Sequence, residues 1–315
     1  MKTKLEQLLE DLTASGAVGH RMPLHHLSNL MEEESQHVSA AWSTWPVALR
    51  RQLITRLVEL AESDFEMDFG ALFRLALDDE DAQVRCAAVE GLWEDEDVRL
   101  VPRFVTCLLE DEDPAVRAAA AVSLGRFVLL GELQKIRPRP FALAYSALLQ
   151  SCRATDQHPE VWRRALESLA YVNNEEVAEL IEQAYAADDE KLRVSAVFAM
   201  GRSANRRWAV QVRQEMFSPN PEMRYESARA CGEIVLKEAV PDLEELAADA
   251  DPEVQEAALW ALGQIGGERA RRILQRYCAD DDEATRAAAE AAMAEFEFLH
   301  GELSDLFGRL DEEAS

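Results

Sequence analysis

The stretch DPEVQEAALWALGQIG, residues 251–266, decides the fold because the chain contains close copies of it. Similar stretches are DEDPAVRAAAAVSLG at 111–125 and DDEKLRVSAVFAMG at 188–201. In each copy, apolar residues recur four positions apart, and such residues share one face of a helix. One position differs in kind, since Trp260 stands where another copy has Val122. The stretch therefore predicts a repeated amphipathic helix and singles out one unusual aromatic residue.

The copies recur with a nearly constant period. Aligned on one anchor position, they are spaced 32, 45, 31, 31, 31 and 31 residues apart, and a second amphipathic segment precedes each of them. A pair of helices this short cannot bury its apolar stripe alone, so neighbouring pairs must stack. The sequence therefore predicts an all-α fold, an α-solenoid of helix pairs. The anchors are Arg85, Arg117, Trp162, Arg193, Arg224, Gln255 and Arg286.

The ends of the repeated helices carry start and stop signals. Asp113, Asn220 and Asp251 each stand directly before a proline. Asp and Asn side chains cap the free N–H groups of a helix start, and proline is tolerated in the first turn. A glycine near the end of a helix is a common exit from it. We therefore expect exits at four glycines, namely Gly125, Gly201, Gly232 and Gly263.

The repeats resemble the HEAT-like repeat family, particularly the short repeats first recognised in phycobilin lyase subunits. The recurring motif D-x-x-V-R-x-x-A-x-x-x-L-G carries this resemblance over roughly residues 64–298. It implies a right-handed superhelix of stacked antiparallel helix pairs, with Asp–Arg ladders between repeats and second helices lining a concave face. An anchor arginine about 60° from the apolar stripe is half-buried and needs a carboxylate or carbonyl partner, which agrees with a ladder. Trp162 and Gln255 depart from that pattern.

The domain organisation follows from the repeat boundaries. We expect N-terminal capping helices and a degenerate repeat at 1–63, seven repeats at 64–298, and a C-terminal capping helix with a tail at 299–315. The extra residues of the 45-residue spacing lie near 127–141, where two prolines predict an ordered but non-helical loop. One face of the last predicted helix is apolar and comprises Leu303, Leu306, Phe307 and Leu310.

Composition limits the classes of partner. The chain has a net charge of −27, from 33 Lys and Arg against 60 Asp and Glu. Such a chain repels nucleic-acid phosphates and anionic membranes, so neither is expected as a partner. Residues 126–230 are the exception, with a balance of +1. No uninterrupted apolar run of 18 residues predicts a membrane span. Five dispersed cysteines without a CxxC pair suggest reduced thiols and a cytoplasmic location.

The candidate binding residues come from helix positions that point away from the paired helix. Trp, Tyr and Arg are enriched in protein-binding hot spots, and several occupy these positions in the third to sixth repeats. Aromatic side chains packed between neighbouring helices are the structural alternative. Our hypothesis is that an extended peptide or helix binds along this strip, with an acidic partner as one alternative. The candidates are Arg126, Arg163, Tyr171, Phe198, Arg202, Tyr225, Arg229 and Trp260.

Catalytic signatures are missing from the sequence. It contains no GxGxxG, GxxxxGK[ST], GxSxG or HExxH motif, and no His-Glu dipeptide of the kind that marks the di-iron deoxyhypusine hydroxylase, a HEAT-like enzyme. We therefore expect no metal and no cofactor. The sequence favours a non-catalytic scaffold that binds a partner protein or peptide along the concave face. The alternative is an accessory or lyase-type subunit whose groove holds a small molecule together with a second chain. Oligomeric state is left open.

Overall fold

The computed structural model describes residues 2–155 and 157–301, and every regular element within them is a helix. The predicted all-α fold is confirmed. The chain divides into two compact units, residues 1–168 and 169–315, a division that the repeat pattern did not predict. Each unit is described by itself. The apolar face predicted from Leu303 to Leu310 lies outside the described residues.

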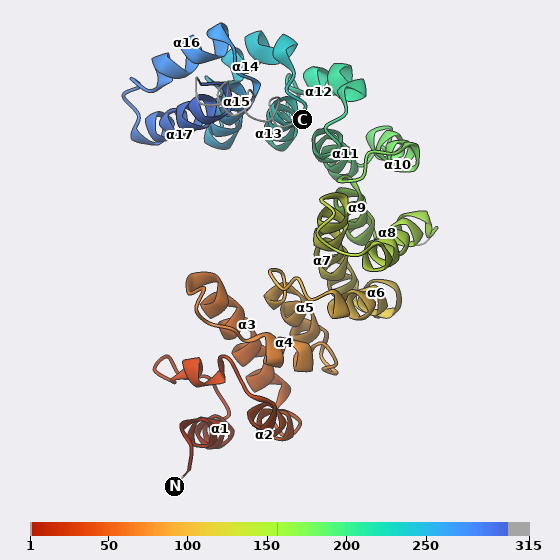
Figure 1. Cartoon of the computed structure of the whole chain (residues 1–315), viewed down its shortest axis with the longest axis vertical. Helices are drawn as coiled ribbons and strands as arrows, with labels where there is room; N and C mark the ends of the chain where they lie inside the picture. Colours follow the sequence, from red (N-terminus) through yellow and green to blue (C-terminus); the bar gives the residue numbers. More distant parts are fainter. Residues whose placement is uncertain (1, 156, 302–315) are drawn as a thin grey trace, which may run out of the picture. The chain divides into compact units, whose positions relative to one another are not determined.

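The first unit is built from stacked helix pairs. Helices α3, α5 and α7 pack successively, while α4 packs on α5 and α6 on α7 (Figure 1). Its elements are α1 (Lys4–Ser15), η1 (Leu24–Leu27), α2 (Glu32–Trp42), α3 (Val47–Ser63), α4 (Gly70–Ala76), α5 (Ala82–Gly91), η2 (Val98–Leu100), α6 (Val101–Glu110), α7 (Pro114–Glu132), α8 (Pro138–Arg153) and α9 (Pro159–Leu169), whose last residue begins the second unit.

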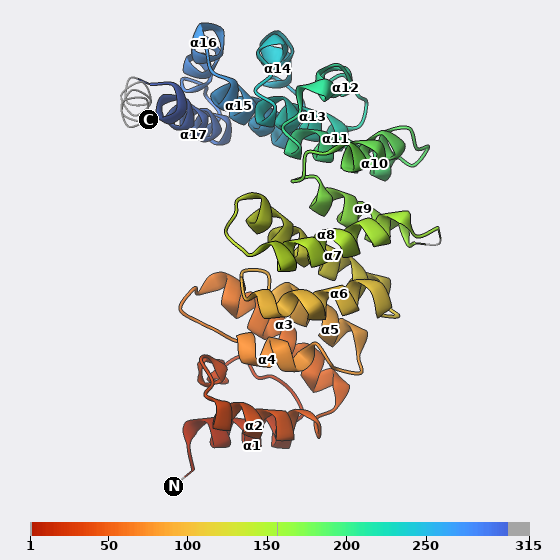
Figure 2. The same ribbon diagram turned by 45° about the vertical axis from the view of Figure 1, so that its right-hand side comes forward.

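The second unit repeats one pair four times. Helices α11, α13, α15 and α17 pack one after another in one layer, and each contacts the helix before it, in the other layer. Figures 1 and 2 both show these two layers. Its elements are α10 (Glu175–Tyr185), α11 (Glu190–Arg202), η3 (Arg206–Trp208), α12 (Ala209–Glu215), α13 (Pro221–Glu233), η4 (Lys237–Ala239), α14 (Val240–Leu246), α15 (Pro252–Ile265), α16 (Glu268–Tyr277) and α17 (Glu283–His300).

The predicted helix starts are confirmed. The Asp113 side chain accepts a hydrogen bond from the Ala115 N–H at 2.8 Å. Asn220 and Asp251 accept equivalent bonds at 2.9 Å from the residues two positions ahead. In all three helices the proline occupies the first turn, where its missing N–H removes no intrahelical bond.

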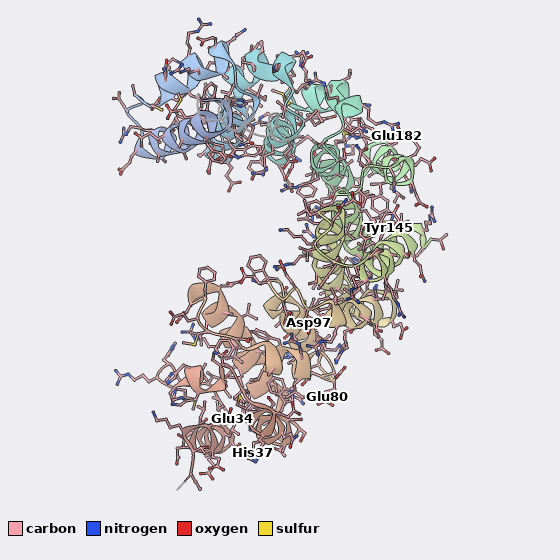
Figure 3. The ribbon with its side chains drawn as sticks, viewed as in Figure 1. Glu34, His37, Glu80, Asp97, Tyr145 and Glu182 are labelled. Atoms are coloured by element: carbon pink, nitrogen blue, oxygen red, sulfur yellow. The ribbon has the colours of Figure 1, made fainter. Side chains whose placement is uncertain are left out.

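The predicted loop near 127–141 is largely wrong. Helix α7 continues to Glu132 and α8 begins at Pro138, which leaves only residues 133–137 outside helices. Proline often marks a loop, but Pro138 and Pro140 both stand in the first turn of α8, where proline is compatible with a helix. On α8, Phe141 and Tyr145 stack with ring centroids 6.0 Å apart. Figure 3 labels Tyr145. The extra residues therefore lengthen two helices.

Three of the four repeat glycines, Gly201, Gly232 and Gly263, lie near a helix end as predicted, but none of the four forms the exit itself. All four lie inside α7, α11, α13 and α15. A Cβ atom on Gly232 would come within 2.7 Å of the Trp260 ring, and one on Gly125 within 2.6 Å of Ser168 Oγ. Glycine at this position therefore permits close packing of the next second helix. The chain leaves α11 and α13 through Ala204 and Val235 instead, with φ angles of 48° and 54°.

Within the described residues, arginine–aspartate pairs between successive repeats occur at two of the seven anchors, Arg85 and Arg224, which is part of the ladder that the resemblance implied. Arg85 donates two hydrogen bonds to the Asp111 carboxylate, at 2.7 and 2.8 Å. It also donates a hydrogen bond to the Asp79 carbonyl at 2.9 Å, which joins Arg85 to the turn before its own helix, α5. Gln255 retains only the second of these roles, through a 2.6 Å bond to the Asp249 carbonyl. Trp162 instead donates its indole N–H to the Cys152 carbonyl at 2.8 Å.

Helix α7 is long and apolar enough to cross a membrane by length and composition, which the sequence analysis did not anticipate. It packs against α5, α6 and α8, and 56% of its apolar window is buried inside the protein. Arg117, within it, donates hydrogen bonds to the Asp111 and Glu112 carbonyls. These contacts are those of a core helix of the first unit. All five cysteines are free thiols, as the sequence suggested.

Candidate functional site

The candidate residues are divided between the two units. Arg126 lies on α7 and Arg163 on α9, both in the first unit. Phe198 and Arg202 lie on α11, Tyr225 and Arg229 on α13, and Trp260 on α15 of the second unit. Tyr171 follows α9, half-buried, and among the described residues no hydrogen bond, ion pair or ring contact joins it to the others. The candidates that the structure brings together are therefore those of the second unit.

Arg163 does not fit the prediction. Its side chain points into the protein, and the residue is only 8% exposed. Its guanidinium lies 2.8 Å from the Glu160 carboxylate and 3.9 Å from that of Glu167. Helix position alone predicted an outward-facing residue, but two glutamates one turn away on the same helix neutralise its charge and allow its burial.

Arg126 is held within the first unit. It forms an ion pair with Glu96 at 3.0 Å and donates a hydrogen bond to the Trp93 carbonyl. The Trp93 side chain itself is 56% exposed, and the sequence analysis overlooked it. A signal was present, because residue 93 stands eight positions after its anchor, where four other copies have the close-packing glycine.

The second-unit candidates form an arginine–aromatic cluster, defined here as Phe198, Arg202, Arg229, Glu233 and Trp260. The Arg202 guanidinium lies over the Phe198 ring at 5.2 Å, and that of Arg229 lies over the Trp260 ring at 4.5 Å. Both arginines approach the same oxygen of Glu233, at 3.1 Å and 3.6 Å. The cluster links α11, α13 and α15, and both guanidinium charges already have partners.

Glu233 is the centre of this cluster. Burial raises the pKa of its carboxyl, and the nearby charges of Arg202 and Arg229 oppose that shift. Its carboxylate lies close to Gly201, at which a Cβ atom would come within 2.6 Å of Glu233 Oε2. The glycine of one repeat thus makes room for the glutamate of the next. A shared, half-buried acceptor fixes both arginines in place.

The position of Trp260, where another repeat has Val122, has room for a large side chain. Its ring lies against Gly232 of the preceding second helix, where no side chain intervenes, and beneath Arg229. The indole is thereby held between two helices, yet it remains half-exposed. Trp260 therefore packs against its neighbours and also presents a fixed aromatic surface to solvent, which combines the two interpretations that the sequence left open.

A cavity of about 680 Å³ opens beside Trp260, between α13 and α15. Tyr225, Arg229 and Trp260 contribute to its wall, so three of the predicted residues meet there. The remaining wall is mainly acidic, which the sequence analysis missed. Five carboxylates line the cavity, from Glu222, Glu226, Asp251, Glu253 and Glu256.

Several charges of the first-helix layer are paired across repeats. Arg207 contacts the Glu175 carboxylate at 2.9 Å and that of Glu182 at 3.2 Å. Figure 3 labels Glu182 on α10. Arg206 pairs with Glu238 at 2.9 Å. The opposite side of the second unit is formed by α11, α13, α15 and α17. We call the surface of these helices that is turned away from α10, α12, α14 and α16 the open face.

Comparison with known proteins supports the architecture. The family model for HEAT repeats matches residues 71–137 and 209–294. The fold is similar to the complex of CpcE and CpcF of phycocyanin lyase from Nostoc sp. PCC7120, with a TM-score of 0.53 and 18% identity over 90% of this chain and 99% of that chain. No curated protein sequence matches the chain.

Two further solved structures are less similar. Human deoxyhypusine hydroxylase in complex with glycerol gives a TM-score of 0.38 at 20% identity, covering 85% of this chain and 97% of that chain. A designed armadillo repeat protein gives 0.40 at 21% identity, covering 62% and 99%. The resemblance drawn from the repeat motif is confirmed as to repeat family and architecture.

Proposed function

We propose that this HEAT-repeat protein is a non-catalytic scaffold that binds a protein or peptide partner along the open face of its second unit. The cavity between α13 and α15 carries the proposal, because it gathers Tyr225, Arg229 and Trp260 at one place. Tyr, Trp and Arg dominate the energetics of protein interfaces, and they act best in a pocket that a partner can desolvate.

The fixed position of Trp260 favours tight binding. Its ring is held between Gly232 and Arg229 before any partner arrives. A side chain that is already immobile loses little conformational entropy on binding, so more of the contact free energy appears as affinity. Burying the part of an indole still exposed to solvent contributes on the order of 1–3 kcal/mol. Trp260 is accordingly the proposed anchor residue.

The non-catalytic role rests on the kinds of side chain at this face. Catalysis by metals needs convergent ligands, and among the described residues no group of three His, Cys, Asp or Glu side chains could hold a metal ion. The acidic side chains at the cavity come from different helices and line its wall. A cytoplasmic location is part of the proposal, and the five free thiols support it.

The proposal is tested by affinity purification from the native host with immobilised protein, followed by mass spectrometry. Wild type and Trp260→Ala are compared with Phe217→Ala as a matched control. Phe217 is also an exposed aromatic residue, but it follows α12 and lies away from the cavity lining. We expect a stoichiometric partner on wild type and on the control, and its loss from Trp260→Ala.

Thermal melting of the same variants separates binding from packing. If Trp260→Ala retains the partner, or loses it only together with a fall of many degrees in melting temperature, the open face is not the binding surface. A coloured or small-molecule ligand that copurifies without any protein would favour the alternative of an accessory or lyase-type subunit.

A further inference from the structure

The cavity beside Trp260 has the wrong charge for an acidic partner. Five carboxylates line it and only one guanidinium, that of Arg229. Arg229 is already engaged, since it stacks on the Trp260 ring at 4.5 Å and lies 3.6 Å from the Glu233 carboxylate. An incoming carboxylate would therefore meet a negative wall with no uncommitted positive charge. This reverses the acidic character considered for the partner from sequence.

Three of the carboxylates have no partner of their own. Glu222, Glu253 and Glu256 are exposed, and within the described residues their side chains form no hydrogen bond or ion pair. Asp251 differs, because it caps the start of α15. Unpaired carboxylates on a concave wall sum to a negative potential that attracts cations.

A second acidic cavity adjoins the first. It has a volume of about 700 Å³, lies between α15 and α17, and shares Glu253 and Glu256 with the first cavity. Asp280 and Asp282 add two more carboxylates to its wall, together with the ring of Tyr277. The two cavities thus lie on either side of α15, and the same two glutamates belong to both.

The chemistry of these walls suits organic cations. Ammonium and guanidinium groups are attracted to carboxylates and to the faces of aromatic rings, and their aliphatic stems pack along apolar surface. A metal ion requires ligands that converge on one point, and no such group exists in the described part of the chain. Lysine and arginine side chains of a peptide combine a cationic group with an aliphatic stem, so they suit both the carboxylates and the apolar surface of these walls.

We propose that the second unit binds a cationic peptide segment whose Lys or Arg side chains enter the two acidic cavities on either side of α15. The proposal rests on the proposed function and names its partner class. Packed helices lie about 8–10 Å apart. A polyproline II segment repeats its side-chain direction every three residues, a rise of about 9 Å. Basic residues at positions i and i+3 therefore match successive cavities.

Fluorescence anisotropy with the full chain and labelled synthetic decapeptides tests this proposal. The first peptide carries Lys at every third position in a proline-rich background. A second peptide has the same composition with its lysines adjacent, and a third has Glu in place of Lys. We expect the first to bind at least tenfold more tightly than the second, the third to show no binding, and the affinity of the first to fall as salt concentration rises.

The deciding variant is Glu253→Gln/Glu256→Gln, which removes the two carboxylates common to both cavities while preserving shape. Its matched control is Glu245→Gln/Glu268→Gln, which removes the same charge from α14 and α16 in the first-helix layer, where both side chains are exposed. We expect the first double variant to weaken binding of the spaced-lysine peptide at least tenfold and the control to change it less than twofold.

Equal losses in both double variants, or unchanged affinity in the first, would overturn the proposal. Binding of the glutamate peptide would do the same. The partner captured from the native host distinguishes failure of the cationic-peptide proposal from failure of the proposed scaffold function. If that partner requires Trp260 but binds Glu253→Gln/Glu256→Gln as well as wild type, the scaffold function stands and the cationic class is wrong.

Discussion

Arg224 donates two parallel hydrogen bonds to the carboxylate of Asp249, from Nε to Oδ2 at 2.7 Å and from Nη2 to Oδ1 at 2.8 Å. The same arginine donates to the Ser218 carbonyl at 2.9 Å, at the start of its own helix. One side chain thus joins the start of α13 to the turn before α15. This geometry makes the stability of α13 depend on the repeat that contains α15.

Asp249→Asn tests the contribution of that ion pair. The amide retains an acceptor for the Asp251 N–H but loses the charge opposite Arg224. A charge-assisted, half-buried pair contributes about 1–3 kcal/mol, so we expect the free energy of unfolding at pH 7 to fall by about that amount. Urea unfolding followed by circular dichroism provides the measurement. A change in the free energy of unfolding below about 0.3 kcal/mol would show that the ion pair does not stabilise the fold.

The Arg224–Asp249 pair also predicts how the free energy of unfolding depends on pH. The hydrogen bond from Arg224 lowers the pKa of Asp249 in the folded chain, with the burial of the carboxyl opposing that shift. A lowered folded pKa means that the stabilisation is complete above the unfolded pKa of about 4 and is lost as pH falls through the folded pKa. The difference in unfolding free energy between wild type and Asp249→Asn should therefore shrink below pH 4. A constant difference down to pH 2.5 would contradict the account.

The ladder position at Arg193 is incomplete and can be repaired. Arg193 is the anchor of α11, and its buried Nε has no hydrogen-bond partner in the described chain. The residue that corresponds to Asp111 and Asp249 is here Ser218, whose hydroxyl accepts the Asn220 N–H at 3.3 Å but carries no charge. We expect Ser218→Asp to raise the free energy of unfolding by about 1 kcal/mol.

An acidic residue close to the start of α13 is favourable even without Arg193, so a double-mutant cycle isolates the new pair. The gain from Ser218→Asp should largely disappear in an Arg193→Met background. Equal gains in both backgrounds would mean that residue 218 does not reach Arg193.

Val235 provides a separate test of the helix exits. It leaves α13 with φ of 54°, a left-handed conformation that a β-branched side chain adopts with strain. The side chain is exposed, so little packing is lost on its removal. We expect Val235→Gly to stabilise the protein by about 1 kcal/mol, and Val235→Ala by less. Thermal unfolding measures both, and a lower melting temperature for the glycine variant would show that the exit is not strained.

The period of the sequence was sufficient to predict the helix pairs. The anchors from Arg85 to Arg286 all fall on second helices, and the caps at Asp113, Asn220 and Asp251 lie where the proline steps indicated. Capping and apolar spacing are local properties, so a sequence reveals them without tertiary information. The boundaries 1–63, 64–298 and 299–315 stay a prediction.

Contacts between helices were harder to predict. The sequence pattern indicates a helix exit at the glycine that four repeats share, although its role is to admit a neighbour such as Trp260 against Gly232. Position on a helix also indicated which residues face outward, but it did not reveal that Glu233 already neutralises Arg202 and Arg229. The acidic wall around Trp260 therefore became evident only when α13 and α15 were placed side by side.

The most direct test of the binding account is the indole N–H resonance of Trp260 in a ¹⁵N-labelled full chain, assigned by its loss in Trp260→Phe. On titration with the spaced-lysine peptide at low salt, the account predicts that this resonance shifts progressively to saturation, while those of the buried Trp42 and Trp208 stay in place. A Trp260 resonance that stays in place at saturating peptide, or moves no more than those two, would contradict binding at the open face.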